Sequence, residues 1–223
     1  MRQGNRSRAD VHAASLPLAT PSLPRRLRGP RSTLQALRDD LAFLQGFIRH
    51  PDQVGSVIPS SGWLERRLVR AADLARARTV VELGPGTGGT TRAFLRALPA
   101  RAHLLAIELS PVFHARISSA IGDPRFVAQL GSAEQIAEFL AARRLPAPDA
   151  VISGIPFSTM PGAVADRIAA AVATVLAPGG RFVAYQVRAH VASFATPYLG
   201  SPRTEWEWLN VPPVRVFTWQ KPR

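Results

Sequence analysis

Apolar residues follow two different periods along most of the chain, and the two periods alternate. Short runs rich in Val, Leu, Ile and Ala are typical of buried strands, and they occupy residues 79–83, 103–107, 125–129, 150–153 and 181–187. Stretches with helical spacing of apolar residues lie between these runs, over 88–98, 111–121, 132–144 and 162–176. This alternation predicts an α/β domain, in which βαβ units build a parallel sheet with helices on both faces.

Two further apolar runs, 204–209 and 214–220, lie near the end of the chain. Only residues 210–213, Asn-Val-Pro-Pro, connect them. A connection this short has no room for a crossover helix, so the two runs are predicted to form an antiparallel hairpin at the end of the sheet. Five parallel strands followed by such a hairpin describe a Rossmann-like sheet.

A third pattern precedes the first strand. Apolar residues at 34, 37, 41, 44 and 48 recur at helical spacing, and Phe43 and Phe47 widen that stripe. Thr33 is a candidate N-cap, and Pro51 marks the end of the segment. The pattern predicts an amphipathic helix, which either covers the domain or lies in a membrane surface with Phe43 and Phe47 inserted.

Composition excludes several kinds of site. The chain has 223 residues, 46% of them hydrophobic, and this length suffices for a core without cross-links. It contains no cysteine, which excludes disulfide scaffolds, zinc fingers, iron–sulfur clusters and thiol nucleophiles. The five His are scattered, so we expect no metal site.

Positive charge is distributed unevenly along the chain. The net charge is +13, and residues 1–33 hold seven Arg and four Pro against one Asp. We expect a disordered basic arm over 1–33, a docking or lid segment over 34–62, and the catalytic domain over 63–223. The excess of cations suits an anionic partner, either nucleic acid or a membrane with acidic lipids. No apolar run reaches the roughly 20 residues of a transmembrane helix, and the N-terminus lacks a continuous signal-peptide core, so we expect a cytoplasmic protein.

The strongest motif follows the first strand. Residues 82–88 read Glu-Leu-Gly-Pro-Gly-Thr-Gly and open a helix, so the backbone can turn tightly and approach a ligand closely. Glu-x-Gly-x-Gly-x-Gly is the signature of methyltransferases that use S-adenosylmethionine. We expect Glu82 to anchor the amino group of the methionine moiety, Glu108 at the end of the second strand to accept both ribose hydroxyls, and residues 131–133 to contact adenine. The predicted cofactor residues in these loops are Glu82, Gly84, Pro85, Gly86, Thr87, Gly88, Glu108, Leu109, Gly131, Ser132 and Ala133.

The fourth strand ends in Ser-Gly-Ile-Pro-Phe-Ser over residues 153–158. N6-adenine methyltransferases carry Asn-Pro-Pro-Tyr or a relative of it at this place, beside the transferred methyl. Here the proline and the aromatic residue are kept, but the Asn is missing. We therefore expect a nitrogen acceptor other than a flipped adenine, held by the backbone oxygen of Ile155 and the ring of Phe157, with Ser153 and Gly154 touching the cofactor. The alternative is that residues 155–157 pack under the sheet.

Residues after the fifth strand are candidates for substrate binding. Tyr185 ends that strand and is the leading candidate for orienting an amine, by a hydrogen bond or a cation–π contact. A structural role for Tyr185 in the core is the alternative. Arg188 and His190 follow, and they are expected either to bind a phosphodiester or to be a solvated surface pair; Tyr198 is a further candidate for the substrate site.

Over residues 40–223 the chain resembles the small bacterial phospholipid N-methyltransferases. The matching segments are 47–51, 54–61, 82–88, 153–161, 210–213 and 216–219, of which Pro-Ser-Ser at 59–61 and Gly-Ile-Pro-Phe at 154–157 discriminate best. The resemblance implies S-adenosylmethionine as cofactor, S-adenosylhomocysteine as product, and Ser60 and Ser61 in the cofactor site. It also implies stepwise methylation of phosphatidylethanolamine to phosphatidylcholine, by a peripheral enzyme that docks on anionic lipid at the inner face of the cell membrane.

Two other functions fit parts of this pattern. An RNA adenine dimethyltransferase would share the fold, the proline–aromatic motif and the basic surface. The missing Asn before that motif argues against it, and so against nucleic acid as the partner. A membrane-associated module that binds S-adenosylmethionine without catalysis would keep both Glu82 and Glu108, and only turnover distinguishes it from an enzyme.

Overall fold

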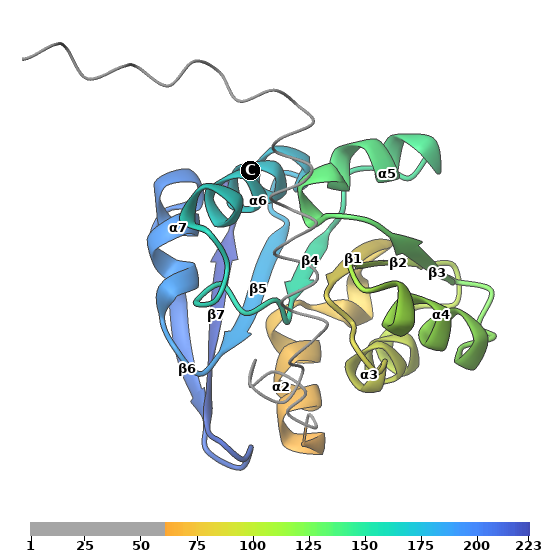
Figure 1. Ribbon diagram of the computed structural model, residues 1–223, viewed down its shortest axis with the longest axis horizontal. Helices are drawn as coiled ribbons and strands as arrows, with labels where there is room; N and C mark the ends of the chain where they lie inside the picture. Colours follow the sequence, from red (N-terminus) through yellow and green to blue (C-terminus); the bar gives the residue numbers. More distant parts are fainter. Residues whose placement is uncertain (1–60) are drawn as a thin grey trace, which may run out of the picture.

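The computed structural model describes residues 61–223, and within them a seven-stranded sheet forms the centre of the molecule (Figure 1). The strand order is β3-β2-β1-β4-β5-β7-β6; β1 to β5 are parallel, and β7 runs antiparallel to both β5 and β6. The predicted α/β sheet with a terminal hairpin is confirmed. The strands are β1 (Thr79–Leu83), β2 (His103–Glu108), β3 (Phe126–Leu130), β4 (Ala150–Ser153), β5 (Arg181–Gln186), β6 (Arg203–Glu207) and β7 (Val214–Gln220).

Helices cover both faces of the sheet, as Figure 1 shows. Helices α5 (Ile136–Ala142), α6 (Gly162–Val175) and α7 (His190–Leu199) pack on one face, around a core that includes Val81, Leu105 and Phe182. Helices α2 (Gly62–Ala71) and α3 (Gly89–Ala97) pack on the other face, against Val80 and Leu104. Successive strand residues point to opposite faces, so fully buried strands such as β1 supply both cores.

Several predicted boundaries need correction. The expected helix over 132–144 is divided into the 3-10 helix η2 (Ala133–Gln135) and α5, because Ser132 and Gln135 form a capping box at this turn. Strand β3 begins and ends one residue later than expected, and β6 ends two residues earlier. Helix α7 was not predicted at all. It contains Pro197 and has no clear polar face, so the periodicity of its sequence was uninformative.

Helix α4 (Pro111–Ala120) and the short 3-10 helix η1 (Leu74–Arg76) complete the elements. No helix among residues 61–223 is long and apolar enough to span a bilayer. The predicted helix over 34–48 with Phe43 and Phe47, the basic arm over 1–33 and the predicted cofactor residue Ser60 lie outside the described residues.

Strand register determines which loops meet at the carboxyl edge of the parallel sheet. Leu83, Ile107 and Ser153 stand at equivalent heights in β1, β2 and β4. In the antiparallel part, Gln186 at the end of β5 lies opposite Arg215 near the start of β7. The loop of the β6–β7 hairpin therefore projects from the same edge as the glycine-rich loop that follows β1.

Candidate functional site

The glycine-rich loop connects β1 to α3 and adopts a backbone that only glycine accommodates without strain. Gly84, Gly86 and Gly88 have φ of 72°, 55° and 81°, all in the left-handed region. The N–H of Gly84 donates to the carbonyl of Ile107 at 2.9 Å, which ties the loop to the end of β2. A side chain at Gly86 would meet no atom within 4 Å, so open space lies against the backbone there. The loop thus presents bare backbone to this space.

Glu82 lies at the end of β1, beneath this loop. Its side chain is buried, and its Oε1 accepts a hydrogen bond of 2.6 Å from the hydroxyl of Thr90 in the first turn of α3. Its Oε2 is buried and has no hydrogen-bond partner. Burial raises the pKa of Glu82 to about 7, although the bond from Thr90 works in the opposite direction. A buried carboxylate oxygen without a partner is costly, and a cationic ligand group would satisfy it.

Glu108 ends β2 on the other side of the loop. Its two carboxylate oxygens accept backbone N–H groups, Oε2 from Gly86 at 3.1 Å and Oε1 from Ser110 at 2.9 Å. Burial raises the pKa of Glu108, and these N–H bonds partly offset that rise. Within residues 61–223 neither Glu82 nor Glu108 forms an ion pair. Each carboxylate oxygen can accept more than one bond, so Glu108 retains capacity for hydroxyl donors.

The predicted adenine-contact residues follow β3 and stand at the same edge. The N–H of Gly131 donates to the carbonyl of Glu108 at 3.0 Å, which joins this loop to the end of β2. A side chain at Gly131 would collide with the ring of Phe139, so only glycine fits at this position of the loop. Ser132 caps η2, Ala133 is buried and Leu109 is exposed. The predicted cofactor residues after β1, β2 and β3 are therefore gathered along one edge.

Ser61 is placed differently from the other predicted cofactor residues. Its hydroxyl caps α2 by accepting the N–H of Leu64 at 3.2 Å, and its own N–H donates to Asn210 of the hairpin loop at 3.0 Å. The contacts of Ser61 are thus with α2 and the hairpin. In this position it joins two elements of the domain.

The segment after β4 is attached to the glycine-rich loop. The N–H of Gly154 donates to the carbonyl of Leu83 at 3.0 Å, and the hydroxyl of Ser153 accepts the N–H of Ile155 at 3.3 Å. A methyl group at 154 would lie 2.9 Å from Cζ of Tyr185 and 3.3 Å from the carbonyl oxygen of Gly84. The Tyr185 ring therefore lies where the segment after β4 and the glycine-rich loop meet.

Tyr185 is half-buried at the end of β5, close to Glu82. Burial raises the pKa of its hydroxyl, the negative charge of Glu82 raises it further, and hydrogen bonding with Thr90 lowers it in part. The hydroxyl is therefore protonated at any physiological pH. It can both donate to and accept from a group at the site.

Phe157 requires a correction. It is only 1% exposed and belongs to the core on the α6 and α7 face, where its ring lies 6.4 Å from that of Phe194. A ring buried in this way has no face left for an acceptor amine, so Phe157 supports the segment from below. The structure therefore agrees with the alternative interpretation, in which this residue packs under the sheet.

The three residues expected to bind substrate are not brought together. Arg188 and His190 are exposed, directly after β5 and at the first residue of α7. Tyr198 lies near the other end of α7, and its hydroxyl donates to the carboxylate of Asp166 on α6 at 3.0 Å. The first two border the carboxyl edge, whereas Tyr198 joins two helices.

Two polar residues of the site were missed by sequence reasoning. Gln186, buried at the end of β5, donates through Nε2 to the carbonyl of Ile155 and so holds the segment after β4. Thr90 binds Glu82, as described above. The only sequence signal was position, since Gln186 follows Tyr185 at a strand end and Thr90 is in the first turn after the glycines.

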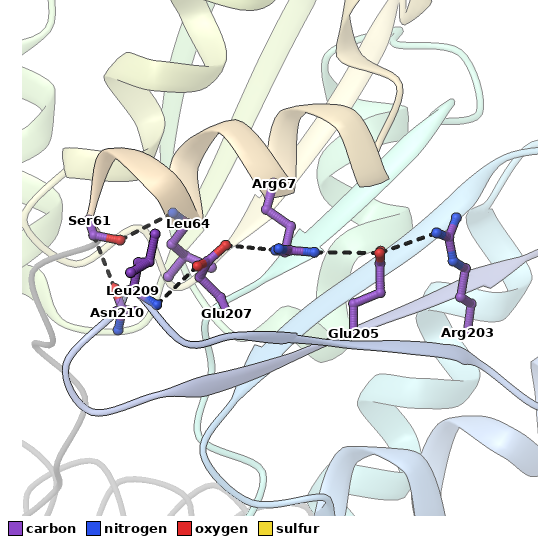
Figure 2. Close-up of polar contacts among 8 residues, drawn as sticks. All are labelled: Ser61, Leu64, Arg67, Arg203, Glu205, Glu207, Leu209 and Asn210. Atoms are coloured by element: carbon purple, nitrogen blue, oxygen red, sulfur yellow. Dashed lines mark hydrogen bonds and ion pairs between the residues drawn. The ribbon is translucent and has the colours of Figure 1, made fainter.

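A second polar cluster joins α2 to the β6–β7 hairpin, and Figure 2 shows it. Nε of Arg67 donates to Glu207 at 2.7 Å, and its NH1 lies 3.4 Å from Glu205. The N–H of Leu209 also donates to Glu207, at 3.1 Å. Burial alone would raise the pKa of Glu207, but the bonds from Arg67 and Leu209 outweigh it and lower the pKa. These carboxylates are satisfied from within the chain.

Comparisons with known proteins extend these observations. No family model matches the chain. The ornithine lipid N-methyltransferase of Singulisphaera acidiphila is 31% identical over 147 residues, which cover 66% of this chain and 77% of that protein. The ribosomal RNA small subunit methyltransferase A of Kineococcus radiotolerans is 36% identical over 98 residues, but these cover 42% of this chain and only 30% of that longer protein.

Solved structures agree with the fold. The N-methyltransferase NodS from Bradyrhizobium japonicum WM9, in complex with S-adenosyl-L-homocysteine, has a TM-score of 0.59 at 13% identity, covering 81% of this chain and 99% of that one. The O-methyltransferase TomG from Streptomyces achromogenes, in complex with S-adenosylmethionine, has a TM-score of 0.56 at 15% identity, covering 85% and 96%. At such identities the likeness concerns the fold.

Proposed function

Because the chain belongs to the family of class I S-adenosylmethionine-dependent methyltransferases that includes the ornithine lipid N-methyltransferase, we propose that it methylates the primary amine of a membrane lipid. Its cofactor is S-adenosylmethionine and its product S-adenosylhomocysteine. The proposed substrate is phosphatidylethanolamine, with its mono- and dimethyl derivatives, on the way to phosphatidylcholine. Ornithine lipid offers the same chemistry, an amine on a lipid headgroup, and is the second candidate.

The residues of the glycine-rich loop suit this cofactor. The unpartnered Oε2 of Glu82 would accept a cationic amino group, and Glu108 would accept hydroxyl donors. The open space at Gly86 would admit the ligand against bare backbone. We assign Leu109, Gly131, Ser132 and Ala133 to the adenine side of the same site. When bound, the cofactor supplies an electrophilic methyl group on a sulfonium.

One observation supports nitrogen as the acceptor atom above all others: the hydroxyl of Tyr185 lies at the junction of the glycine-rich loop and the segment after β4. A lipid ammonium has a pKa of about 10 and no lone pair until it loses its proton. A neutral hydroxyl and the carbonyl of Ile155, which Gln186 holds in place, can accept hydrogen bonds from the amine and orient its lone pair. Positive charge passes from sulfonium to product ammonium, so no oxyanion hole is required.

The headgroup phosphate would lie beyond this amine. Arg188 and His190 are exposed at the same edge and are the candidate phosphate ligands, with the planar guanidinium suited to two oxygens at once. Tyr198 is bound to Asp166, which makes it the weaker candidate for substrate contact. As part of the same proposal, the enzyme works at the inner face of the cell membrane, where the basic chain meets anionic lipid.

The test is incubation of the full chain with methyl-labelled S-adenosylmethionine and three acceptors in parallel: vesicles with phosphatidylethanolamine, vesicles with ornithine lipid, and ribosomal RNA. We expect labelled lipid in at least one vesicle arm, and thin-layer separation then identifies the methylated species. Label in RNA alone would replace the proposal with the RNA methyltransferase alternative. Cofactor binding without labelled product in any arm would favour the non-catalytic module.

Arg188→Ala distinguishes the two lipids. We expect the KM for phosphatidylethanolamine to rise about tenfold, because one charged hydrogen-bonding partner of the phosphodiester is lost. The KM for ornithine lipid should change less than twofold, because its amine belongs to an amino-acid headgroup and not to a phosphodiester headgroup. Arg101→Ala removes an equally exposed cation before β2, at the opposite edge, and serves as the matched control. Equal effects of the two substitutions would show that only net charge matters.

A further inference from the structure

The tryptophans are distributed unevenly between core and surface. Trp219 is 1% exposed and stacks on Phe182 at 5.2 Å in the core. The other three of the four tryptophans are exposed, together with two aliphatic residues of the hairpin loop, at 36% to 85%. We call this set the aromatic tip: Trp63, Trp206, Trp208, Leu209 and Val211. Large apolar groups this exposed at neighbouring positions suggest a binding surface.

The aromatic tip lies at the carboxyl edge of the sheet. The hairpin loop projects there, since Glu207 pairs with Val214 and Arg215 lies opposite Gln186 of β5. Trp63 is in the first turn of α2, whose cap Ser61 is bonded to Asn210 in the hairpin loop (Figure 2). Figure 1 shows the hairpin loop beside α2 at one end of the molecule. The tip therefore borders the edge that carries Gly86, Tyr185 and Arg188.

Cations are interleaved with these aromatic rings. The guanidinium of Arg66 lies 4.3 Å from the ring centre of Trp63, and that of Arg215 lies 4.5 Å from Trp206. Trp206 in turn stacks on Trp208 at 4.8 Å. Nε of Arg215 is buried and has no hydrogen-bond partner. Aromatic rings beside arginines suit the boundary between acyl chains and anionic headgroups, where indoles concentrate and guanidinium binds phosphate.

Hydrogen bonds hold the scaffold below the tip. Asn210 is fully buried, with its Oδ1 bonded to Ser61 and its Nδ2 to the carbonyl of Pro212 at 3.0 Å. Glu207 is bonded to both Arg67 and Leu209. Polar residues thus fix the backbone, while the apolar side chains of the tip point away from the core. The backbone of this surface therefore has its conformation before a partner binds.

We propose that the aromatic tip is a docking surface for an anionic bilayer. Leu209 and Val211 enter the acyl boundary, the three indoles lie at headgroup depth, and Arg66 and Arg215 meet lipid phosphates. The inference rests on the proposed lipid substrate, because docking in this orientation holds the carboxyl edge against the headgroups. It adds a membrane-binding surface in the catalytic domain itself.

Tryptophan fluorescence of the full chain tests this directly and requires no turnover. The probe is a vesicle of phosphatidylethanolamine and phosphatidylglycerol with brominated acyl chains. We expect a blue shift and quenching on binding, whereas vesicles of phosphatidylcholine alone should give neither. Emission that is already shielded from acrylamide without vesicles would overturn the proposal, since residues 1–60 of the same chain would then cover the tip.

A double substitution localises the contact. Trp208→Glu with Val211→Glu should lower the vesicle partition coefficient at least tenfold and leave the affinity for S-adenosylmethionine within twofold. Ala141→Glu with Ala147→Glu adds the same charge at two exposed positions near the amino edge, one in the last turn of α5 and one in the loop before β4, and should change partition less than threefold. Thermal melting verifies that both variants fold. Equal partition of the two variants overturns the proposal.

The remaining outcomes separate this inference from the proposed function. Loss of self-association in the tip variant, with vesicle binding unchanged, would assign the tip to a second copy of the chain and overturn membrane docking. Absence of any methylated lipid with wild-type enzyme would refute the lipid substrate. The quenching result would then still decide whether the tip meets a bilayer.

Discussion

Two pairs of glutamates in this domain have different surroundings, although Glu82, Glu108 and Glu207 are all buried and only Glu205 is partly exposed. Glu82 and Glu108 flank the glycine-rich loop without an ion pair among the described residues, and burial raises both pKa values. Glu205 and Glu207 face Arg67, and the pKa of Glu207 is lowered. In the first pair Oε2 of Glu82 has no partner among the described residues, whereas Arg67 and the Leu209 N–H satisfy Glu207 in the second. We therefore expect the first pair to bind a ligand and the second to stabilise the fold, because only the second faces an internal cation.

Gly86→Val should have the largest effect on the first pair. Valine at φ 55° is strained, and its branched side chain would fill the open space that the loop presents. We expect the affinity for S-adenosylmethionine, measured by calorimetry, to fall at least a hundredfold. Gly122→Val is the control, because that glycine also has open space around it but no positive φ. Retained affinity in Gly86→Val would refute the assignment of this loop.

Arg67→Ala tests the second pair. Removing this cation leaves the buried carboxylate of Glu207 unpaired, and the free energy of unfolding should fall by about 2 kcal/mol in urea denaturation. Cofactor affinity should stay within twofold. Arg203→Ala, which breaks only the exposed contact with Glu205, should cost less than about 0.5 kcal/mol. If both substitutions cost the same, the cluster contributes only surface charge.

The contributions of Glu82 and Glu207 to stability should depend on pH with opposite signs. Glu82, with a pKa near 7, must be ionised to hold a cation, so cofactor affinity should fall about tenfold between pH 8 and pH 6. Glu82→Gln should weaken binding and flatten this profile. Because its pKa is raised in the fold, Glu82 lowers stability as pH rises from 4.5 to about 7.

The same pH series should be measured for Glu207. Its pKa is lowered, so its contribution to stability is present at neutral pH and is lost as the pH falls through the lowered value. Unfolding of Glu207→Gln should therefore depend less on pH in the acid range than unfolding of the wild type. Parallel slopes for the Glu82 and Glu207 variants would contradict the distinction between the two pairs.

Tyr185→Phe has the smallest expected effect and concerns the neighbour of Glu82. One hydrogen bond of about 1 kcal/mol to the acceptor amine is lost, so kcat should fall about fivefold while cofactor affinity stays within twofold. Turnover equal to that of the wild type would restrict Tyr185 to packing.

Much of the fold could be predicted from the sequence because its signals are local. Buried runs, the glycine-rich loop and the four-residue connection before β7 each have a short-range cause, and the order of elements follows from them. Helix α7 was missed because its stripe of apolar residues is interrupted by Pro197 and has no polar counterpart. Local periodicity is uninformative where a helix is held mainly by its neighbours.

The site was less accessible to such reasoning. Glu82 belongs to a motif and Glu108 ends a predicted strand, so both could be placed at the loop, but the bond from Gln186 to Ile155 joins residues 31 positions apart. The bond from Ser61 to Asn210 spans 149 positions. Phe157 was expected at the substrate because its motif is aromatic, yet tertiary packing buries it beneath the segment. Residues that only the folded chain brings into contact leave no periodic pattern in the sequence.

The close approach of Tyr185 to Gly154 has a consequence for redesign of the acceptor pocket. Any side chain at 154 would enter the volume that the phenol occupies, so substitutions at 154 and 185 must be chosen together. Enlarging the first requires shrinking the second. Room for a bulkier nitrogen is therefore gained by a smaller side chain at 185, and a library that varies position 154 alone would sample mostly side chains that collide with Tyr185.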